Sequence, residues 1–213
     1  MDQREGAWRS VGTVCAAGAA AAGADGYGVT LATGPGLREV VIASDDLGHL
    51  VEDAQLTSGQ GPCTDAYLTL EPVLVPDLAA AAGRWPGFVS IAAPRGVGAV
   101  FAFPLAVAGI PVGAVDFFRR DPGGLSGAPL AEAAACARAA SGVAFRSLPV
   151  PPTGAAPGLP PRVHQAGGML AALLDVPVPE AIVRLRAYAY VHDRTLLAIA
   201  EEVLLRRHTL DDE

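Results

Sequence analysis

The segment GQGPC at residues 59–63 is the sharpest local signal for chemistry in this chain. It places Cys63 shortly after two glycines, Gly59 and Gly61, which would let an oxyanion or a phosphate approach the backbone. On this interpretation Cys63 is a redox sensor or a nucleophile. We favour the alternative, a tight turn that starts a helix with a small buried thiol. No His or basic residue is near in sequence to stabilise a thiolate, although His49 could approach in space. The segment also lacks the Lys-Ser/Thr that ends a phosphate-binding P-loop, so nucleotide hydrolysis has no support.

Scattered carboxylates are a second candidate feature. Oxygen ligands from Asp53, Asp65, Asp77 and Asp116 could together bind a metal. Asp65 and Asp77 also suit helix caps and turns, and the three cysteines show no CxxC or Cys/His ligand spacing. We therefore expect neither a metal nor another cofactor.

Two aromatic residues, Trp85 and Phe88, flank a Pro-Gly pair. Together with Cys63 they are candidates for a pocket over a sheet that receives a small signal molecule. They could equally form the lid of an ordinary core, and the sequence names no ligand.

The C-terminal part shows helical periodicity in three short stretches, with apolar residues recurring on one face of each. The face residues are Val163, Ala166, Leu170 and Leu173, then Val178, Ile182, Leu185 and Ala189, then Leu196, Ala200 and Val203. Pro179 suits the first turn of the second helix, and Thr195 is an expected N-cap of the third. A compact all-α module of three helices is predicted.

Removing these apolar positions leaves a set of polar and aromatic side chains that could contact RNA. The set is Gln165, Arg184, Arg186, Tyr188, Tyr190 and Arg194. Arg offers a forked donor for phosphate or a base edge, and Tyr offers a face on which an unpaired base can stack. The plainer alternative is that Arg184 and Arg186 are solvated charges and that Tyr188 belongs to the core.

The N-terminal part predicts an α+β domain with a central antiparallel sheet. The expected elements are helices at 5–22, 46–57, 65–70 and 128–145, strands at 27–31, 39–43, 72–76, 97–104 and 111–118, and a loop at 84–88. Residues 96–115 are uncharged and long enough to span a membrane, but two prolines and four glycines favour paired strands that turn near Gly109. An uncharged stretch at 10–24 is a poor signal peptide, because Asp2 and Glu5 precede it. We expect a soluble, cytoplasmic protein.

Composition sets the domain boundaries and limits the kind of binding. Residues 148–161 hold six prolines, two glycines and no charge, which predicts a stiff linker between a domain at 5–147 and one at 162–210. The net charge is −7, and all fifteen basic residues are Arg. Residues 161–213 carry six Arg against eight Asp and Glu. A strongly basic nucleic-acid binder is excluded, whereas a small Arg patch is not.

Several segments of the first domain resemble the GAF domain, a sensory fold. The likeness lies in VEDAQLTSGQGPCTDA at 51–66 and continues through 75–78, 85–88, 103–105 and 113–116. The C-terminal pattern, with QAGGM at 165–169, RLRAYAY at 184–190 and IAEEV at 199–203, is similar to the ANTAR domain of bacterial antitermination regulators. Their order resembles GAF–ANTAR regulators of high-GC bacteria.

This resemblance implies that the chain is not an enzyme but a homodimeric regulator. It would bind paired RNA hairpins with unpaired loop bases, prevent a terminator from forming, and use helices 5–22 and 128–145 to dimerise. The resemblance supports Gln165, Arg186 and Arg194 most directly as RNA contacts. Gly167 departs from the family, where Lys or Ala is usual, and with the acidic count it lowers the expected affinity.

Two rival functions stay open. One is a GAF-fold thiol enzyme similar to reductases of free methionine sulfoxide, which would need Cys15 or Cys136 close to Cys63. The other is an interaction module whose helical tail binds protein. RNA binding and sulfoxide turnover discriminate the three.

Overall fold

A five-stranded antiparallel sheet, with strand order β2-β1-β5-β4-β3, organises the N-terminal domain. The computed structural model describes residues 3–34, 37–147 and 158–205. The strands are β1 (Gly26–Gly34), β2 (Leu37–Ala43), β3 (Val73–Val75), β4 (Ala99–Val107) and β5 (Ile110–Arg119). The uncharged stretch at 96–115 is therefore mostly the β4–β5 hairpin, which turns through Ala108 and Gly109 at positive φ.

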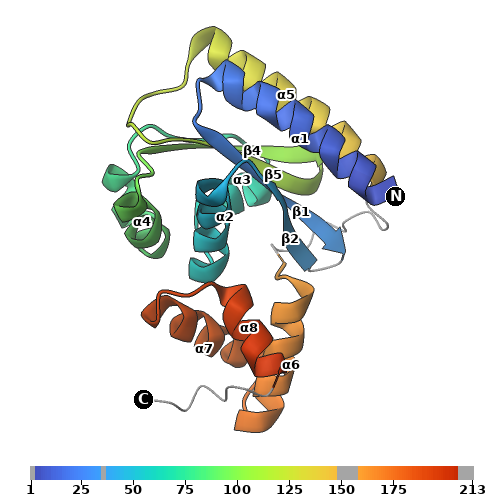
Figure 1. The fold of residues 1–213 in the computed structure, drawn as a ribbon, viewed down its shortest axis with the longest axis vertical. Coiled ribbons are helices and arrows are strands. Elements are labelled where there is room, and N and C mark those ends of the chain that lie inside the picture. Colours follow the sequence, from blue (N-terminus) through green and yellow to red (C-terminus); the bar gives the residue numbers. More distant parts are fainter. Residues whose placement is uncertain (1–2, 35–36, 148–157, 206–213) are drawn as a thin grey trace.

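One face of the sheet is covered by α1 (Gln3–Ala22) and α5 (Gly127–Ser147), which lie side by side (Figure 1). Small residues let these helices approach closely. A Cβ on Gly18 would lie 2.7 Å from Cζ of Phe117, so this position must remain a glycine for α1 to pack on β5. Val29, Leu31 and Phe103 complete the core on this face.

The opposite face carries α2 (Asp46–Ser58), α3 (Pro62–Thr69), α4 (Pro86–Ala92) and the 3-10 turns η1 (Ala79–Gly83) and η2 (Ala93–Arg95). Asp45 caps α2, since its carboxylate accepts the Gly48 N–H at 2.8 Å. Gly59 ends α2 at φ 68°, a conformation that favours glycine.

The segment expected as a loop at 84–88 instead begins α4. Pro86 occupies the first turn of this helix, where a missing N–H costs nothing. Gly87 lets α4 pack against the end of α2, because a Cβ there would lie 3.0 Å from Cβ of Ser58. The Pro-Gly pair therefore starts a helix and does not interrupt the chain.

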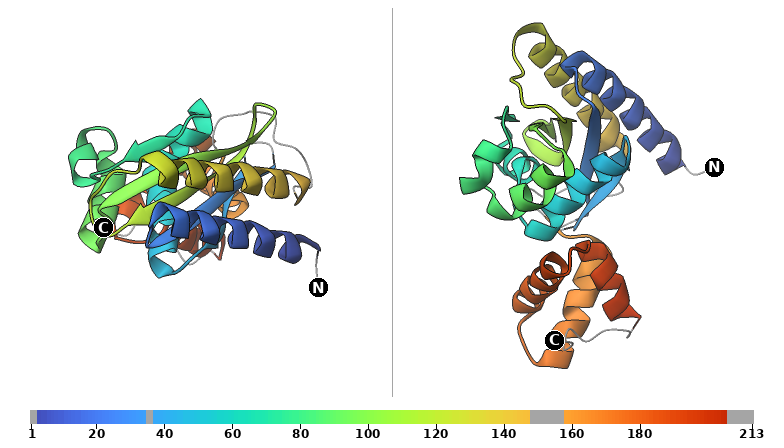
Figure 2. Two further views of the ribbon diagram at one scale, coloured as in Figure 1. Left: turned by 90° about the horizontal axis from the view of Figure 1, so that it is seen from above. Right: turned by 60° about the vertical axis from the view of Figure 1, so that its left-hand side comes forward.

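The C-terminal part is a three-helix module of α6 (Pro161–Leu174), α7 (Val178–Val191) and α8 (Leu196–Leu204), and Figure 2 shows it as a separate lobe. Its core contains Leu170, Leu185, Leu196 and Ile199. Leu173 and Val178 were expected on the buried faces of their helices but are 60% and 41% exposed. In α6, Ala171 and Leu174 pack instead of Leu173, because the helix turns past the core in its last turn.

The predicted linker at 148–161 lies only partly within the described residues. Residues 148–157 fall outside them. Leu159 is buried in the module core and Pro161 opens α6, so the end of the Pro-rich segment packs with the module.

No single helix in the described ranges has the length and apolar composition needed to cross a membrane; α6 and α7 meet that test only jointly, as a pair bent by 107°.

Candidate functional site

A cluster of buried polar side chains lies between α2, α3 and the sheet. Glu52 and Gln55 extend from α2, Cys63 from the first turn of α3, Thr30 from β1 and Asp116 from β5. All five are at most 4% exposed. Because neighbouring residues of a strand point to opposite faces, Val29 and Phe117 enter the α1/α5 core while Thr30 and Asp116 face α2. We call these five residues the polar cluster.

Hydrogen bonds connect the polar cluster across three elements. The Thr30 hydroxyl donates to Oε2 of Glu52 at 2.5 Å, and the Cys63 thiol lies 4.0 Å from the same oxygen. The Gln55 amide nitrogen donates to Oδ2 of Asp116, while its Oε1 accepts the Cys63 N–H at 2.7 Å. Gln55 therefore fastens α2 to β5 and to the start of α3.

Glycines make room for these side chains. A Cβ on Gly28 would collide with the Glu52 side chain, and one on Gly61 would collide with Gln55. Gly61, the second glycine of the GQGPC segment, therefore leaves space for the Gln55 side chain and not for a ligand. Sequence reasoning missed Thr30, Glu52 and Gln55 as members of a site. The available signal was a Glu and a Gln at core-facing spacing on α2, one turn after Gly48 and Val51.

The polar cluster has the donor atoms of a metal site. Within the described ranges, Glu52, Cys63 and Asp116 form a group whose candidate ligand atoms all lie within 4.8 Å of one another. Thr30 and Gln55 already donate hydrogen bonds to two of these carboxyl groups. Those bonds give the cluster an architectural role that needs no ion.

The other predicted sensor and carboxylate residues do not join the polar cluster. Trp85 and Phe88 are buried in the core around α4, and Arg84 lies over the Trp85 ring at 4.2 Å. Asp65 forms an ion pair with Arg84 at 2.7 Å. Asp77 accepts the Ala80 N–H at 3.2 Å, which is the cap role that its sequence position suggested.

Three of the predicted RNA contacts lie on the side of the module that faces the N-terminal domain. Arg186 and Tyr190 are one helical turn apart on α7, and Arg194 follows just before α8. Arg186 packs against Gly59, with its Nη1 3.1 Å from where a Cβ would be. The Tyr190 hydroxyl lies 2.9 Å from Oγ of Ser90.

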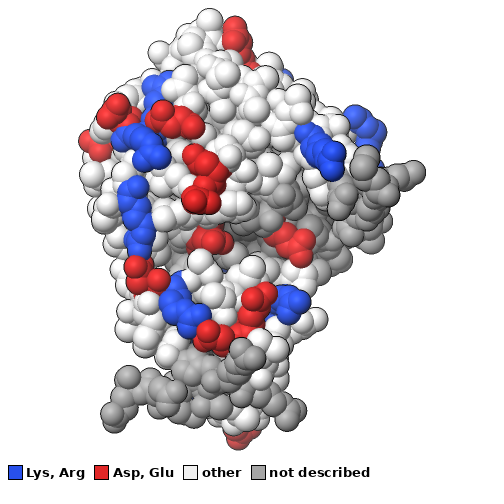
Figure 3. All heavy atoms as spheres, in the orientation of Figure 1, with Lys and Arg blue, Asp and Glu red and all other residues white. Residues whose placement is uncertain are grey.

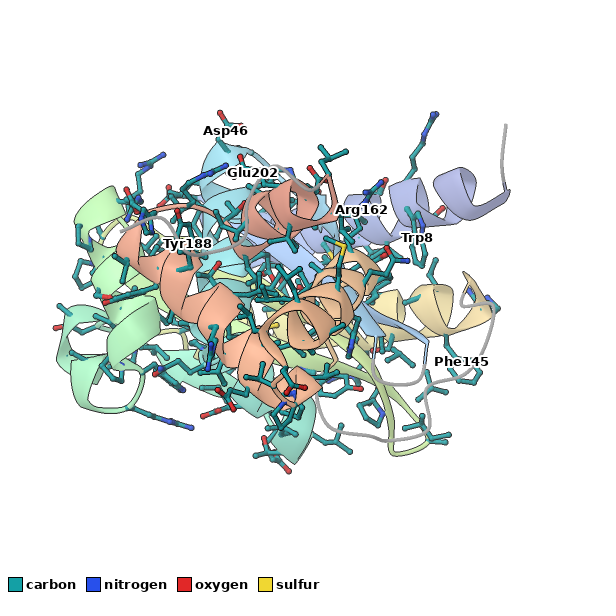
Figure 4. The ribbon with its side chains drawn as sticks, turned by 90° about the horizontal axis from the view of Figure 1, so that it is seen from below. Trp8, Asp46, Phe145, Arg162, Tyr188 and Glu202 are labelled. Atoms are coloured by element: carbon teal, nitrogen blue, oxygen red, sulfur yellow. The ribbon has the colours of Figure 1, made fainter. Side chains whose placement is uncertain are left out.

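The remaining predicted contacts lie elsewhere on the module. Arg184 pairs with Glu180 along α7 at 2.5 Å, and Gln165 is exposed on α6. Tyr188 packs partly on the module core and stacks on His192, with ring centroids 3.8 Å apart. Figure 4 shows Arg162, Tyr188 and Glu202 on the three helices of the module.

Arg194 forms a bidentate ion pair with Glu202 of the same module. Its Nη1 and Nη2 donate to the two carboxylate oxygens of Glu202 at 2.8 and 2.7 Å. These hydrogen bonds raise the pKa of the Arg194 guanidinium above its ordinary value. Thr195 caps α8 as predicted, accepting the Ala198 N–H at 3.1 Å.

The two parts of the chain meet around α2. Leu56 of α2 is buried among module residues, and the Thr57 hydroxyl accepts the Leu196 N–H at 3.1 Å. An ion pair joins Arg95 to Asp193.

Beside these contacts is an open cavity of about 260 Å³, lined by residues of both parts. Asp53 lines this cavity and a second one near Leu197. Burial raises the pKa of the Asp53 carboxyl, and the nearby His49 opposes that shift.

Charges of both signs alternate across the junction. On the face drawn in Figure 3, acidic and basic side chains lie next to one another along the left-hand edge and around the recess between the lobes. This face offers local Arg contacts and no continuous basic surface. A strongly salt-dependent, sequence-independent nucleic-acid interface does not fit it.

Solved structures identify the architecture of the first domain. A domain of a two-component sensor histidine kinase protein from Sinorhizobium meliloti is 19% identical, with a TM-score of 0.51 over 65% of this chain and 90% of that one. The type II free methionine-R-sulfoxide reductase from Thermoplasma acidophilum is 16% identical, with a TM-score of 0.54 over 69% and 98%. The GAF domain of the cyanobacteriochrome TePixJ is 19% identical, with a TM-score of 0.50 over 63% and 86%.

The first domain has a GAF-like fold. Neither a protein-family model nor a curated protein sequence matches the chain. At these identities the likeness concerns the fold, and it confirms the expected α+β arrangement around an antiparallel sheet.

Proposed function

We propose that this chain is a signal-responsive regulator. Its GAF-like domain senses a signal, and its C-terminal module binds RNA hairpins through unpaired loop bases to control transcription termination. The ANTAR-like pattern of the module is the origin of the RNA assignment. The observation that carries it furthest is the grouping of Arg186, Tyr190 and Arg194 on one side of a module with its own core.

These side chains suit a flexible loop of RNA better than a duplex. Arg supplies forked donors for phosphates and base edges, and Tyr190 supplies a stacking face that is 47% exposed. The alternating charges of the junction keep non-specific attraction low, so recognition would depend on a few contacts. A dimer that binds two hairpins would strengthen such contacts by raising the effective concentration of the second one.

The cysteine positions favour this proposal over a thiol reductase. Cys15 and Cys136 belong to α1 and α5, whereas Cys63 belongs to α3 on the other face of the sheet (Figure 1). A thiol relay between Cys63 and either of the others would have to cross the sheet. We therefore expect no turnover of free methionine sulfoxide.

The test is binding of the full-length protein to a labelled tandem RNA hairpin with unpaired loops. We expect Arg186→Ala and Arg194→Ala each to weaken binding by about 1–3 kcal/mol, the range for hydrogen bonds to charged groups. Arg162→Ala is the control. It removes an exposed arginine of the same module together with its ion pair to Glu201, but Arg162 is not a predicted RNA contact. Equal affinity for all four proteins, or equal affinity for a blunt duplex, would contradict the proposal.

A melting curve must accompany each variant. Leu185 is fully buried, so Leu185→Ala should lower the free energy of unfolding by roughly 2–5 kcal/mol. Leu185→Ala therefore shows how RNA binding changes when the module is destabilised. The Arg variants should lose RNA affinity without this loss of stability.

A further inference from the structure

We propose that the GAF-like domain and RNA compete for the same side of the C-terminal module. In the conformation described above, the module is docked, and two of its RNA candidates, Arg186 and Tyr190, contact the GAF-like domain. This inference rests on the proposed function, and it names the internal partner that regulates the RNA-binding residues.

The docking contact is built around two consecutive residues of α2. Leu56 inserts into the apolar core of the module and is 6% exposed. The Thr57 hydroxyl accepts the N–H of Leu196, which is the first residue of α8. The first N–H groups of a helix have no partner within the helix, so the GAF-like domain supplies one from outside. These two contacts fix the N-terminal end of α8 on the end of α2.

Polar contacts around this centre involve the RNA candidates or their neighbours. Arg186 lies against Gly59, whose φ of 68° and lack of a side chain permit the approach. Tyr190 contacts Ser90, and Asp193, next to Arg194, pairs with Arg95. An RNA loop that used Arg186 and Tyr190 together would have to displace the end of α2 at Gly59 and the part of α4 around Ser90. RNA and the GAF-like domain therefore exclude each other.

The junction has the character of a contact that can open. Among the described residues, the buried centre includes the Leu56 side chain and the Leu196 N–H. The side chains of the Arg95–Asp193 pair are 34% and 73% exposed. Exposed pairs contribute little to stability because water screens them. The open cavity of about 260 Å³ beside the contact shows that the two surfaces do not close fully on each other. Domain interfaces of this kind are expected to separate and re-form.

Competition predicts a definite change in RNA affinity. When only a fraction of the protein is competent to bind, the apparent Kd rises by the inverse of that fraction. Variants that open the junction should therefore bind RNA more tightly than the wild type, by about tenfold if about one molecule in ten is normally undocked. By reciprocity, RNA must also shift the wild type toward the open form.

Two variants open the junction without touching the RNA candidates. Thr57→Val keeps the shape of the side chain and removes the acceptor for Leu196. Arg95→Glu replaces attraction to Asp193 by repulsion. Arg84→Glu is the matched control, because Arg84 makes the same kind of ion pair, with Asp65, inside the GAF-like domain. Both Glu variants change the net charge equally, and added negative charge alone would weaken RNA binding.

The experiment measures RNA affinity and docking separately in the full-length protein. Affinity is measured with the tandem hairpin probe, and docking by hydrogen exchange of the α8 amides around Leu196 in the absence of RNA. We expect Thr57→Val and Arg95→Glu to tighten RNA binding about tenfold. Arg95→Glu leaves the Thr57 acceptor of the Leu196 N–H in place, so faster exchange at Leu196 in this variant reports opening of the junction. Arg84→Glu should change neither quantity in that direction. Added RNA should accelerate the same exchange in the wild type.

Three results would overturn the inference. Faster exchange with unchanged or weaker RNA binding would show that docking does not cover the RNA contacts. Unchanged exchange at Leu196 in Arg95→Glu would show that the Arg95–Asp193 pair does not hold the module. Faster exchange with no RNA binding by any protein, wild type included, would reject the proposed function and with it RNA as the competitor, while leaving a reversible internal docking site.

Discussion

Replacing Gln55 by Leu should destabilise the GAF-like domain strongly, although the two side chains are similar in size. Gln55 is 1% exposed and makes two buried hydrogen bonds, one to Asp116 and one from the Cys63 N–H at 2.7 Å. Leu can make neither. The polar cluster would then keep a buried carboxyl group and a buried N–H that have each lost this partner.

The magnitude follows from these two losses. A hydrogen bond to a carboxylate contributes about 1.5–3 kcal/mol, and a buried N–H left without its acceptor costs about 1–3 kcal/mol. The more apolar Leu returns on the order of 1 kcal/mol through burial. We expect a net loss of about 1.5–5 kcal/mol, a large part of the roughly 5–15 kcal/mol that stabilises a domain.

Urea unfolding followed by circular dichroism measures this loss through the midpoint and slope of the transition. Gln165→Leu, the same substitution at an exposed position on α6, is the control and should change stability by less than about 0.5 kcal/mol. A double-mutant cycle of Gln55→Leu with Asp116→Asn should give a coupling of about 1 kcal/mol or more. If Gln55→Leu unfolds like the control, the polar cluster does not stabilise the fold and the reasoning fails.

Three further predictions concern titratable groups. We expect peroxide to leave RNA binding unchanged both in the wild type and in Cys63→Ser. A peroxide effect in the wild type that is absent from Cys63→Ser would instead make Cys63 a redox sensor. Burial, with a smaller contribution from Cys136, raises the pKa of Cys15 from 9.0 to about 12. The folded state therefore resists ionisation of Cys15. The free energy of unfolding should be unaffected below pH 9 and should fall by about 4 kcal/mol as the pH rises from 9 toward 12. Cys15→Ala should not show this loss, and an equal loss in that variant would contradict the assignment to Cys15. Burial raises the pKa of Asp53, so the folded state is most stable while this carboxyl is protonated, and it loses stability as the pH rises from the ordinary pKa through the raised one. Asp53 lines the cavity at the junction, so we expect docking to share this dependence. Asp53→Asn should slow exchange at Leu196 at neutral pH, and faster exchange would reverse the assigned sign.

The periodic elements were predictable because their signals are local. Strands near 27–31 and 111–118 follow from β-branched and aromatic runs, and α7 follows from Ile182, Leu185 and Ala189 on one face. Thr195 as the cap of α8 needed only its position before an apolar helix.

The start of α4 was missed because Pro86-Gly87 has two meanings. A Pro-Gly pair commonly forms a turn, yet Pro also fits the first turn of a helix. Only the packing of Gly87 against Ser58 decides between them, and that contact joins residues far apart in the chain.

The candidate site was only partly predictable for the same reason. Cys63 and Asp116 stood out as single residues, but their meeting with Glu52 depends on the register of β1 against β5 and on where α2 crosses the sheet. The docking contact could not be predicted from the sequence, because the position of Leu56 is equally typical of a core residue of its own domain.

α2 is the element through which a signal could reach the module. Successive residues of a helix differ in direction by about 100°. Gln55 therefore enters the polar cluster, while Leu56 and Thr57 contact the module. The two sets of contacts lie on one helix, so we expect a ligand or a proton that changed how Gln55 is held to shift the surface that holds Leu196. Trp85 and Phe88 pack in the apolar core around α4, which also contains Val51 and Ala54 of α2. Substitutions at Gln55 that spare the fold should alter RNA binding.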